Sequence, residues 1–282
     1  RIPYLGCEPF YYDMERRGIE VRNIAPAMIA SALLNGEVDS GPVPITDCVL
    51  LNEGFQPLSG FCITAVSHSG AIVLHSKAPI ADLRGSSISI PDESSQDRTL
   101  LRMLLTLKHG VDPVYFLDSQ HSEQSHDALL LAGNQALRRR RGVRGFPHRY
   151  DLAEEWREWT GLPLVFFRWM VRTGMERPDA AVLEDALFVG QEDWLDNLYR
   201  MSGPRDDLLM LPKDVLEHIQ SLRFFMGVPE QKAIDLFSQH LESLGLGLAG
   251  VDRPEDLERV NLWTRATFPD LARTWAGNDA WC

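Results

Sequence analysis

The 282 residues of this chain include 28 basic and 40 acidic side chains, which give a formal net charge of −12 at pH 7. Such an acidic surplus argues against nucleic acid as a partner, because phosphate backbones are bound through clustered Lys and Arg. No run approaches the roughly 18 apolar residues of a membrane span, and the opening residues do not resemble a signal peptide. These features predict a cytoplasmic protein that interacts with neither nucleic acid nor membrane.

The cysteines occur singly, with no Cys-x-x-Cys pair and no closely spaced histidine pair nearby. Zinc sites and redox motifs need such spacing, so the sequence predicts neither. Single cysteines in apolar surroundings behave as small buried hydrophobes, which favours a reducing compartment. The four residues are Cys7, Cys48, Cys62 and Cys282.

The first part of the chain alternates short apolar strands with amphipathic helices, a pattern typical of parallel sheets covered by helices. One helix is bounded by Pro26 and by Asn35-Gly36, which are start and stop signals. Strands are predicted over residues 2–5, 19–23 and 40–43, and helices over 10–17, 26–34 and 44–52.

A polar break at His68-Ser69-Gly70 lies between two strand-like segments, 61–67 and 71–75, where a chain can cross between lobes. Further strands are predicted over 86–90, 113–117 and 127–132, with helices over 95–109 and 135–141. The apolar run 164–171 is interpreted as the return crossing, followed by helices over 179–201, 212–224 and 229–245.

The fold class predicted by this order is α/β, with two lobes and a helical C-terminal third. The first lobe is discontinuous and consists of residues 1–70 and 165–250. The second lobe consists of residues 71–164, and a tail follows over 251–282. The long C-terminal helices can bury their apolar stripes internally or against a second copy, so a homodimer is one expectation.

Ligands of open α/β sheets bind beyond the carboxyl ends of strands, where helix N-termini favour anions. Four loops satisfy this rule, at residues 6–9, 41–44, 92–96 and 133–134. Ser94, Ser95 and Gln96 stand at a helix start, where they can hold a carboxylate or simply cap the helix. Asn134 has the same two interpretations.

Groups able to do chemistry are few. Cys7 can act as a nucleophile if a helix N-terminus lowers its pKa, and is otherwise inert packing. Glu8 and Asp97 are the carboxylates nearest the predicted cleft, either general bases or plain surface charges. His68, beside Ser69 at the crossing, is the histidine best placed to contribute.

The segment from Tyr150 to Trp169 joins an acidic amphipathic helix, a Thr-Gly-Leu-Pro turn and an apolar strand. It resembles the corresponding segment of the chorismate dehydratases of the futalosine route to menaquinone, which have the two-lobed type II periplasmic-binding-protein fold. The resemblance extends over roughly residues 2–245. Other matching patches are Ile2-Pro3-Tyr4-Leu5, Gly36-Glu37-Val38-Asp39 and the run from Asp127 to Gly133.

The resemblance implies removal of water from chorismate to give an enolpyruvyl-benzoate, with no metal or organic cofactor. The implied partner is a small carboxylated or aromatic metabolite, and the alternative is a non-catalytic solute-binding or sensor protein. The candidate catalytic residues are Glu8, His68 and Asp97. The candidate substrate-binding residues are Tyr4, Gly6, Cys7, Ser69, Gly70, Ser94, Ser95, Gln96 and Asn134.

Departures from the family pattern fall in the candidate loops. Gly6 replaces an Asn, Asn134 an Asp, Asp97 a Ser, and Gly70 or Ala71 stands where a ligand-binding Ser is expected. Each polar partner lost from a buried anion costs on the order of 1 to 3 kcal/mol. We therefore expect the family scaffold to carry a rebuilt cleft.

Overall fold

The computed structural model describes residues 1–48, 51, 54–90, 95–111, 115–118, 126–201 and 205–244. The chain divides into two compact units, residues 1–233 and 234–282. Helix α8 (Val228–Ser243) ends in the second unit and supplies nearly all of its described residues. The predicted tail, 251–282, lies outside the described residues.

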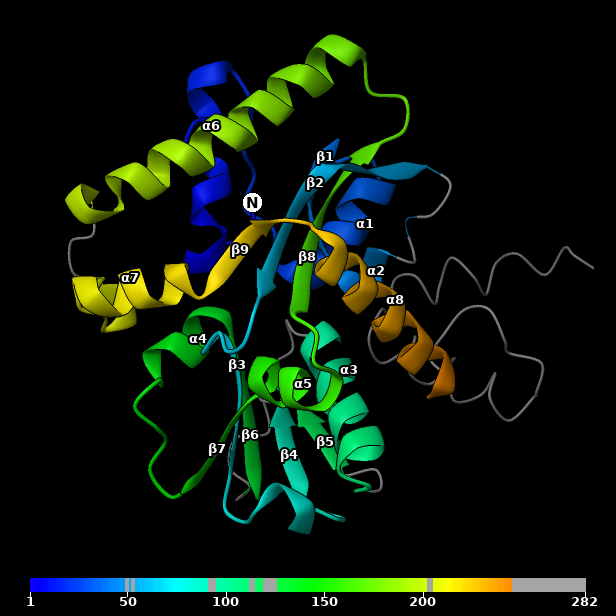
Figure 1. Ribbon diagram of the computed structural model, residues 1–282, viewed down its shortest axis with the longest axis vertical. Helices are drawn as coiled ribbons and strands as arrows, with labels where there is room; N and C mark the ends of the chain where they lie inside the picture. Colours follow the sequence, from blue (N-terminus) through cyan, green and yellow to red (C-terminus); the bar gives the residue numbers. More distant parts are fainter. Residues whose placement is uncertain are drawn as a thin grey trace, which may run out of the picture. The chain divides into compact units, whose positions relative to one another are not determined.

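The first sheet has the strand order β1-β8-β2-β9 and is antiparallel throughout (Figure 1). The apolar return run forms β8 at its centre, between β1 and β2. The strands are β1 (Ser40–Pro44), β2 (Phe55–Ala65), β8 (Leu164–Arg172) and β9 (Leu222–Phe225).

The strand predicted over residues 2–5 is wrong. Pro3 has no N–H for a ladder, and the neighbouring N–H groups are used elsewhere: Ile2 donates to Tyr11 Oη at 3.0 Å, and Leu5 to Asn134 Oδ1 at 3.0 Å. The chain turns instead into a 3-10 helix, η1 (Leu5–Tyr11), which contains Pro9. The predicted helix over 10–17 is accordingly replaced by η1 and a short turn, η2 (Glu15–Arg17).

The strand predicted over residues 19–23 is also wrong, because this stretch joins neither sheet. Its contact with the N-terminus consists of isolated bonds, such as Ile24 N–H to Arg1 O at 3.0 Å. The next helix begins where predicted, at Pro26, as a 3-10 turn (Pro26–Met28) that leads into α1 (Ile29–Leu34).

The second sheet has the order β5-β4-β6-β3-β7, in which β4 runs parallel to β5 and β6 while β3 is antiparallel to β6 and β7. Leu74, Ile88 and Leu130 are fully or almost fully buried at its centre. Its strands are β3 (Ile72–Ser76), β4 (Ser87–Ile90), β5 (Tyr115–Asp118), β6 (Ala128–Ala132) and β7 (His148–Asp151).

Helix α5 (Leu152–Thr160) follows β7 and forms the acidic helix of the segment from Tyr150 to Trp169. Asp151 caps it, because Oδ1 accepts from Ala153 N–H at 2.9 Å. Asp151 Oδ2 accepts the N–H groups of Ser69 at 3.0 Å and Gly70 at 2.6 Å. One carboxylate therefore fixes both α5 and the connection between the two sheets.

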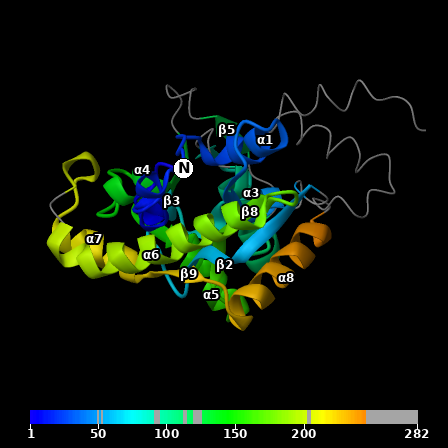
Figure 2. The same ribbon diagram turned by 90° about the horizontal axis from the view of Figure 1, so that it is seen from above.

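The remaining helices cover the sheets and place the loops around the site. In Figures 1 and 2, α6 lies across η1. The two approach closely at Gly190 of α6, where a Cβ would lie 3.3 Å from the carbonyl oxygen of Pro9. None of the described helices is long and apolar enough to cross a membrane. They are α2 (Ile45–Cys48), α3 (Ser95–Met103) with a π-helical continuation (Leu104–Lys108), α4 (Gly133–Arg138), α6 (Arg177–Met201) and α7 (Pro212–Gln220).

The helix predicted over 212–224 is too long. It ends as α7 at Gln220, and Leu222–Phe225 then pairs with β2 as strand β9. Leu222 and Phe224 are buried and alternate with exposed residues, the period of a half-buried strand. The change matters because α7 and Leu222 both reach the candidate site.

Candidate functional site

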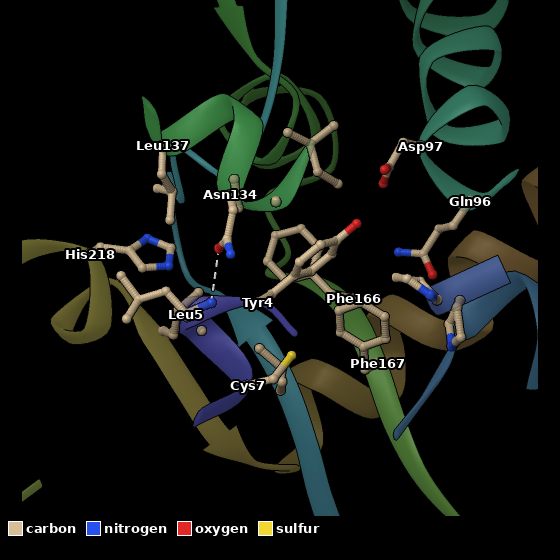
Figure 3. Close-up of a pocket in the computed structure, with 18 of the residues that line it drawn as sticks. Tyr4, Leu5, Cys7, Gln96, Asp97, Asn134, Leu137, Phe166, Phe167 and His218 are labelled. Atoms are coloured by element: carbon tan, nitrogen blue, oxygen red, sulfur yellow. Dashed lines mark hydrogen bonds between the residues drawn. The ribbon is translucent and has the colours of Figure 1, made fainter. Parts of the chain in front are cut away.

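A cavity lies where η1, the starts of α3 and α4, strand β8 and the α7–β9 turn meet (Figure 3). Its empty volume, with the solvent at its open mouth included, is about 640 Å³. Phe166 and Phe167 of β8 give it an aromatic wall, and Leu5, Ile63, Leu137 and Leu222 add apolar surface. The wall of the cavity is therefore largely apolar, with polar groups at the starts of α3 and α4.

The structure brings six of the predicted site residues to the cavity and leaves four outside its lining. Those in the lining are Tyr4, Gly6, Cys7, Gln96, Asp97 and Asn134. Those outside are Glu8, His68, Ser69 and Gly70. Ser94 lies outside the described residues, and Ser95 is described only as the first residue of α3.

The ring of Tyr4 lies in the middle of this site, with its hydroxyl end toward Asp97 (Figure 3). It packs on Gly133, where a Cβ would lie 2.5 Å from both Cε1 and Cζ of the ring. Gly133 also has a φ of +52°, a left-handed conformation that L side chains rarely adopt. A glycine at the start of α4 thus admits the tyrosine ring.

Asn134 uses both ends of its amide to join α4 to the N-terminal loop. Its Oδ1 accepts from Leu5 N–H at 3.0 Å, and its Nδ2 donates to Pro3 O at 2.9 Å. An Asp, as in the family pattern, offers no such donor for Pro3 O when ionised. The substitution in this chain therefore suits a structural bridge.

Gln96 is a buried amide with one end fixed and one end available. Its Oε1 accepts from Ile45 N–H at 2.7 Å, which orients the side chain. Among the described residues its Nε2 has no hydrogen-bond partner, and Gln96 lines the cavity. The amide therefore offers N–H donors to a ligand at the start of α3.

Three further candidates, Cys7, Glu8 and His68, have surroundings less suited to chemistry in the cavity. Burial raises the pKa of the Cys7 thiol well above its usual range, so the thiol stays protonated and is a poor nucleophile. The Glu8 carboxylate accepts Arg205 Nη1 at 2.8 and 2.9 Å. His68 is exposed and lies 3.1 Å from Ser67 Oγ through Nδ1.

His218 is a cavity residue that the sequence reasoning missed. It belongs to the buried stripe of α7, with Val215 and Ile219, and its ring is 7% exposed. Its Nδ1 lies 2.9 Å from Ser69 O, and burial lowers its pKa to about 4. The only local sequence signal of this cavity position is a histidine that interrupts an apolar stripe at helical spacing.

Gly6 lies against His218 and Leu222, which explains why a glycine stands where the family pattern has an Asn. A Cβ at residue 6 would meet Leu222 Cδ1 at 2.8 Å and His218 Nε2 at 3.4 Å. The α7–β9 turn therefore fills the space into which a side chain at position 6 would project.

Gly6→Ala is expected to lower the free energy of unfolding by about 1 to 3 kcal/mol, because Leu222 must move. Urea denaturation measures the change. In a Leu222→Ala background the space beside residue 6 is open, so Gly6→Ala should cost less there than in the wild type. The effects of Gly6→Ala and Leu222→Ala are then non-additive. Gly41→Ala is the control, since nothing lies within 4 Å of its would-be Cβ. An equal loss at both glycines contradicts the prediction.

The structure is that of an α/β protein with two sheets, and the cavity is its candidate ligand site. A family model described as menaquinone biosynthesis matches residues 1–243. The chain belongs to this menaquinone-biosynthesis family, which confirms the resemblance seen in the segment from Tyr150 to Trp169.

Solved structures confirm the fold class. Protein AF1704 from Archaeoglobus fulgidus is similar at a TM-score of 0.67 and 16% identity, over 87% of this chain and 96% of its own. The alkanesulfonate-binding protein SsuA from Xanthomonas axonopodis, bound to MOPS, is similar at a TM-score of 0.61 and 16% identity, over 86% of this chain and 89% of its own. The Candida albicans CA3427 gene product, with the generic periplasmic-binding-protein fold, is similar at a TM-score of 0.52 and 11% identity, over 94% of this chain and 93% of its own.

Proposed function

We propose that this chain binds a small hydroxylated ring carboxylate in the cavity and removes water from it without a cofactor, as a lyase of menaquinone biosynthesis. Family membership supports the pathway. The observation that carries the chemistry is the placement of the Asp97 carboxylate and the Tyr4 hydroxyl beside an aromatic wall (Figure 3).

The reaction breaks one ring C–H bond and the neighbouring C–OH bond, forms a C=C bond and releases water. A carboxylate that accepts the ring proton and a hydroxyl that donates to the departing oxygen contribute typically 10²- to 10⁴-fold each. In this proposal Asp97 is the base and Tyr4 the donor. For chorismate, aromatisation of the ring draws the elimination forward, so positioning is most of the protein's task.

Recognition of the substrate carboxylate falls to the start of α3. None of the described residues that line the cavity is a Lys or Arg. The donors available there are the Gln96 amide and the N-terminal end of α3, whose backbone dipole favours an anion. Phe166 and Phe167 exclude water from the same space, which strengthens such hydrogen bonds.

The test is incubation of the purified protein with chorismate, followed by mass spectrometry for an enolpyruvyl-benzoate. Asp97→Asn is expected to lower kcat by about 100-fold or more while the thermal midpoint stays close to that of the wild type. Glu8→Gln is the matched control, because Glu8 pairs with Arg205 outside the cavity lining. Absence of product, or equal losses in both variants, contradicts the proposal.

A non-catalytic solute-binding or sensor role is the second candidate. It is favoured by the Asn134 amide, which joins α4 to the N-terminal loop where the family pattern has an Asp. The fold neighbours include an alkanesulfonate-binding protein. Thermal stabilisation by chorismate without product formation distinguishes this role from catalysis.

A further inference from the structure

His218 reaches the cavity from α7 and also contacts the connection between the two sheets. Its Nδ1 lies 2.9 Å from the carbonyl oxygen of Ser69, whose own N–H is held by Asp151. Val215 and Ile219, on the same face of α7, are buried on either side. The ring orientation is therefore fixed by packing and by one hydrogen bond.

That hydrogen bond determines the tautomer of His218. A carbonyl oxygen can only accept, so Nδ1 must carry the proton, and a neutral imidazole then has an unprotonated Nε2. Burial lowers the pKa of His218 to about 4, which keeps the ring neutral at pH 7. Its Nε2 is consequently a fixed hydrogen-bond acceptor.

The position of Nε2 directs this acceptor to the ligand space. It lies 3.4 Å from the point where Gly6 would carry a Cβ, and both residues line the cavity (Figure 3). Nε2 has no hydrogen-bond partner among the residues that the structure describes. Helix α7 thus supplies a polar atom to the space beside Gly6.

We propose that His218 Nε2 accepts a hydrogen bond from a hydroxyl group of the ligand, so that the cavity selects a hydroxylated ring over its counterpart without the hydroxyl. The inference rests on the cavity being the ligand site of the proposed function, and it does not depend on the dehydration.

Two substitutions separate this role from a structural one. Asn can replace the Nδ1 donor to Ser69 but has no atom at the Nε2 position, whereas Gln places an oxygen near Nε2 and loses that donor. With 3-hydroxybenzoate as probe, His218→Asn should weaken binding about tenfold, and His218→Gln should weaken it less. Benzoate, the matched probe, should bind all three proteins alike. A structural role predicts the reverse order of the two variants.

Nuclear magnetic resonance of ¹⁵N-histidine-labelled protein tests the tautomer and the contact directly, with His218→Asn assigning the signals. At pH 7 we expect a protonated Nδ1 and an unprotonated Nε2, and a shift of the Nε2 resonance with 3-hydroxybenzoate but not with benzoate. A protonated Nε2, or no shift with either 3-hydroxybenzoate or chorismate, overturns the inference. A shift without chorismate turnover refutes the dehydration alone.

Discussion

Asp47→Asn is expected to stabilise the protein by about 4 kcal/mol at pH 8 and by almost nothing below pH 4. Asp47 is 2% exposed at the start of α2, and burial raises its pKa from 3.8 to about 7. Its Oδ1 accepts from Thr46 Oγ1 at 2.9 Å, while Oδ2 has no partner among the described residues. Asn imitates the protonated, uncharged form that the fold prefers.

The sign follows from the raised pKa. Between pH 3.8 and about 7 the unfolded chain has lost the Asp47 proton and the folded chain keeps it, so the wild type loses stability as pH rises through this window. Urea denaturation from pH 4 to pH 8 measures the difference from Asp47→Asn. Asp82→Asn, at an exposed position, is the control and should follow the wild-type curve. Parallel curves for Asp47→Asn and the wild type would falsify the assignment.

Gly133→Ala is expected to destabilise the protein by about 3 kcal/mol, through a left-handed backbone and a collision with Tyr4. Gly161→Ala shares the first effect only, because its φ is +72° and nothing lies within 4 Å of its would-be Cβ. Gly161→Ala should lower the free energy of unfolding by about 1 kcal/mol. The difference between the two variants isolates contact with the tyrosine ring.

A double-mutant cycle provides the decisive measurement. In a Tyr4→Ala background, the loss of unfolding free energy caused by Gly133→Ala should fall to that caused by Gly161→Ala. The reason is that the ring atoms 2.5 Å from the would-be Cβ are gone. Equal costs with and without Tyr4 would show that the ring does not pack on Gly133. Ligand binding should also weaken in Gly133→Ala, since the displaced ring remains in the cavity.

The sequence patterns located most strands of the two sheets but missed β7 and β9, and they failed at the N-terminus. The parallel pairing that they indicated is wrong for the first sheet, which is antiparallel throughout. The apolar runs 128–132 and 164–171 became central strands, and in the second of them buried residues follow one another, which leaves a continuous apolar signal. Residues 2–5 carry the same signal, but Pro3 and the distant acceptors Tyr11 and Asn134 divert their N–H groups. Local periodicity does not register such long-range partners.

The site was only partly predictable for a similar reason. Gln96 and Asp97 follow from the rule that ligands bind at helix starts beyond strand ends, whereas Tyr4 came from the family resemblance. His218 comes from an ordinary amphipathic helix that packing brings beside Gly6. The glycine at position 6 is explained only once it is seen beside His218 and Leu222.

The paired hydrogen bonds of Asn134 have a kinetic consequence. Any separation of α4 from the N-terminal loop must break the bonds to Pro3 and Leu5 together, since one rigid amide makes both. Each is worth roughly 1 kcal/mol net in water, so the pair slows opening without preventing it.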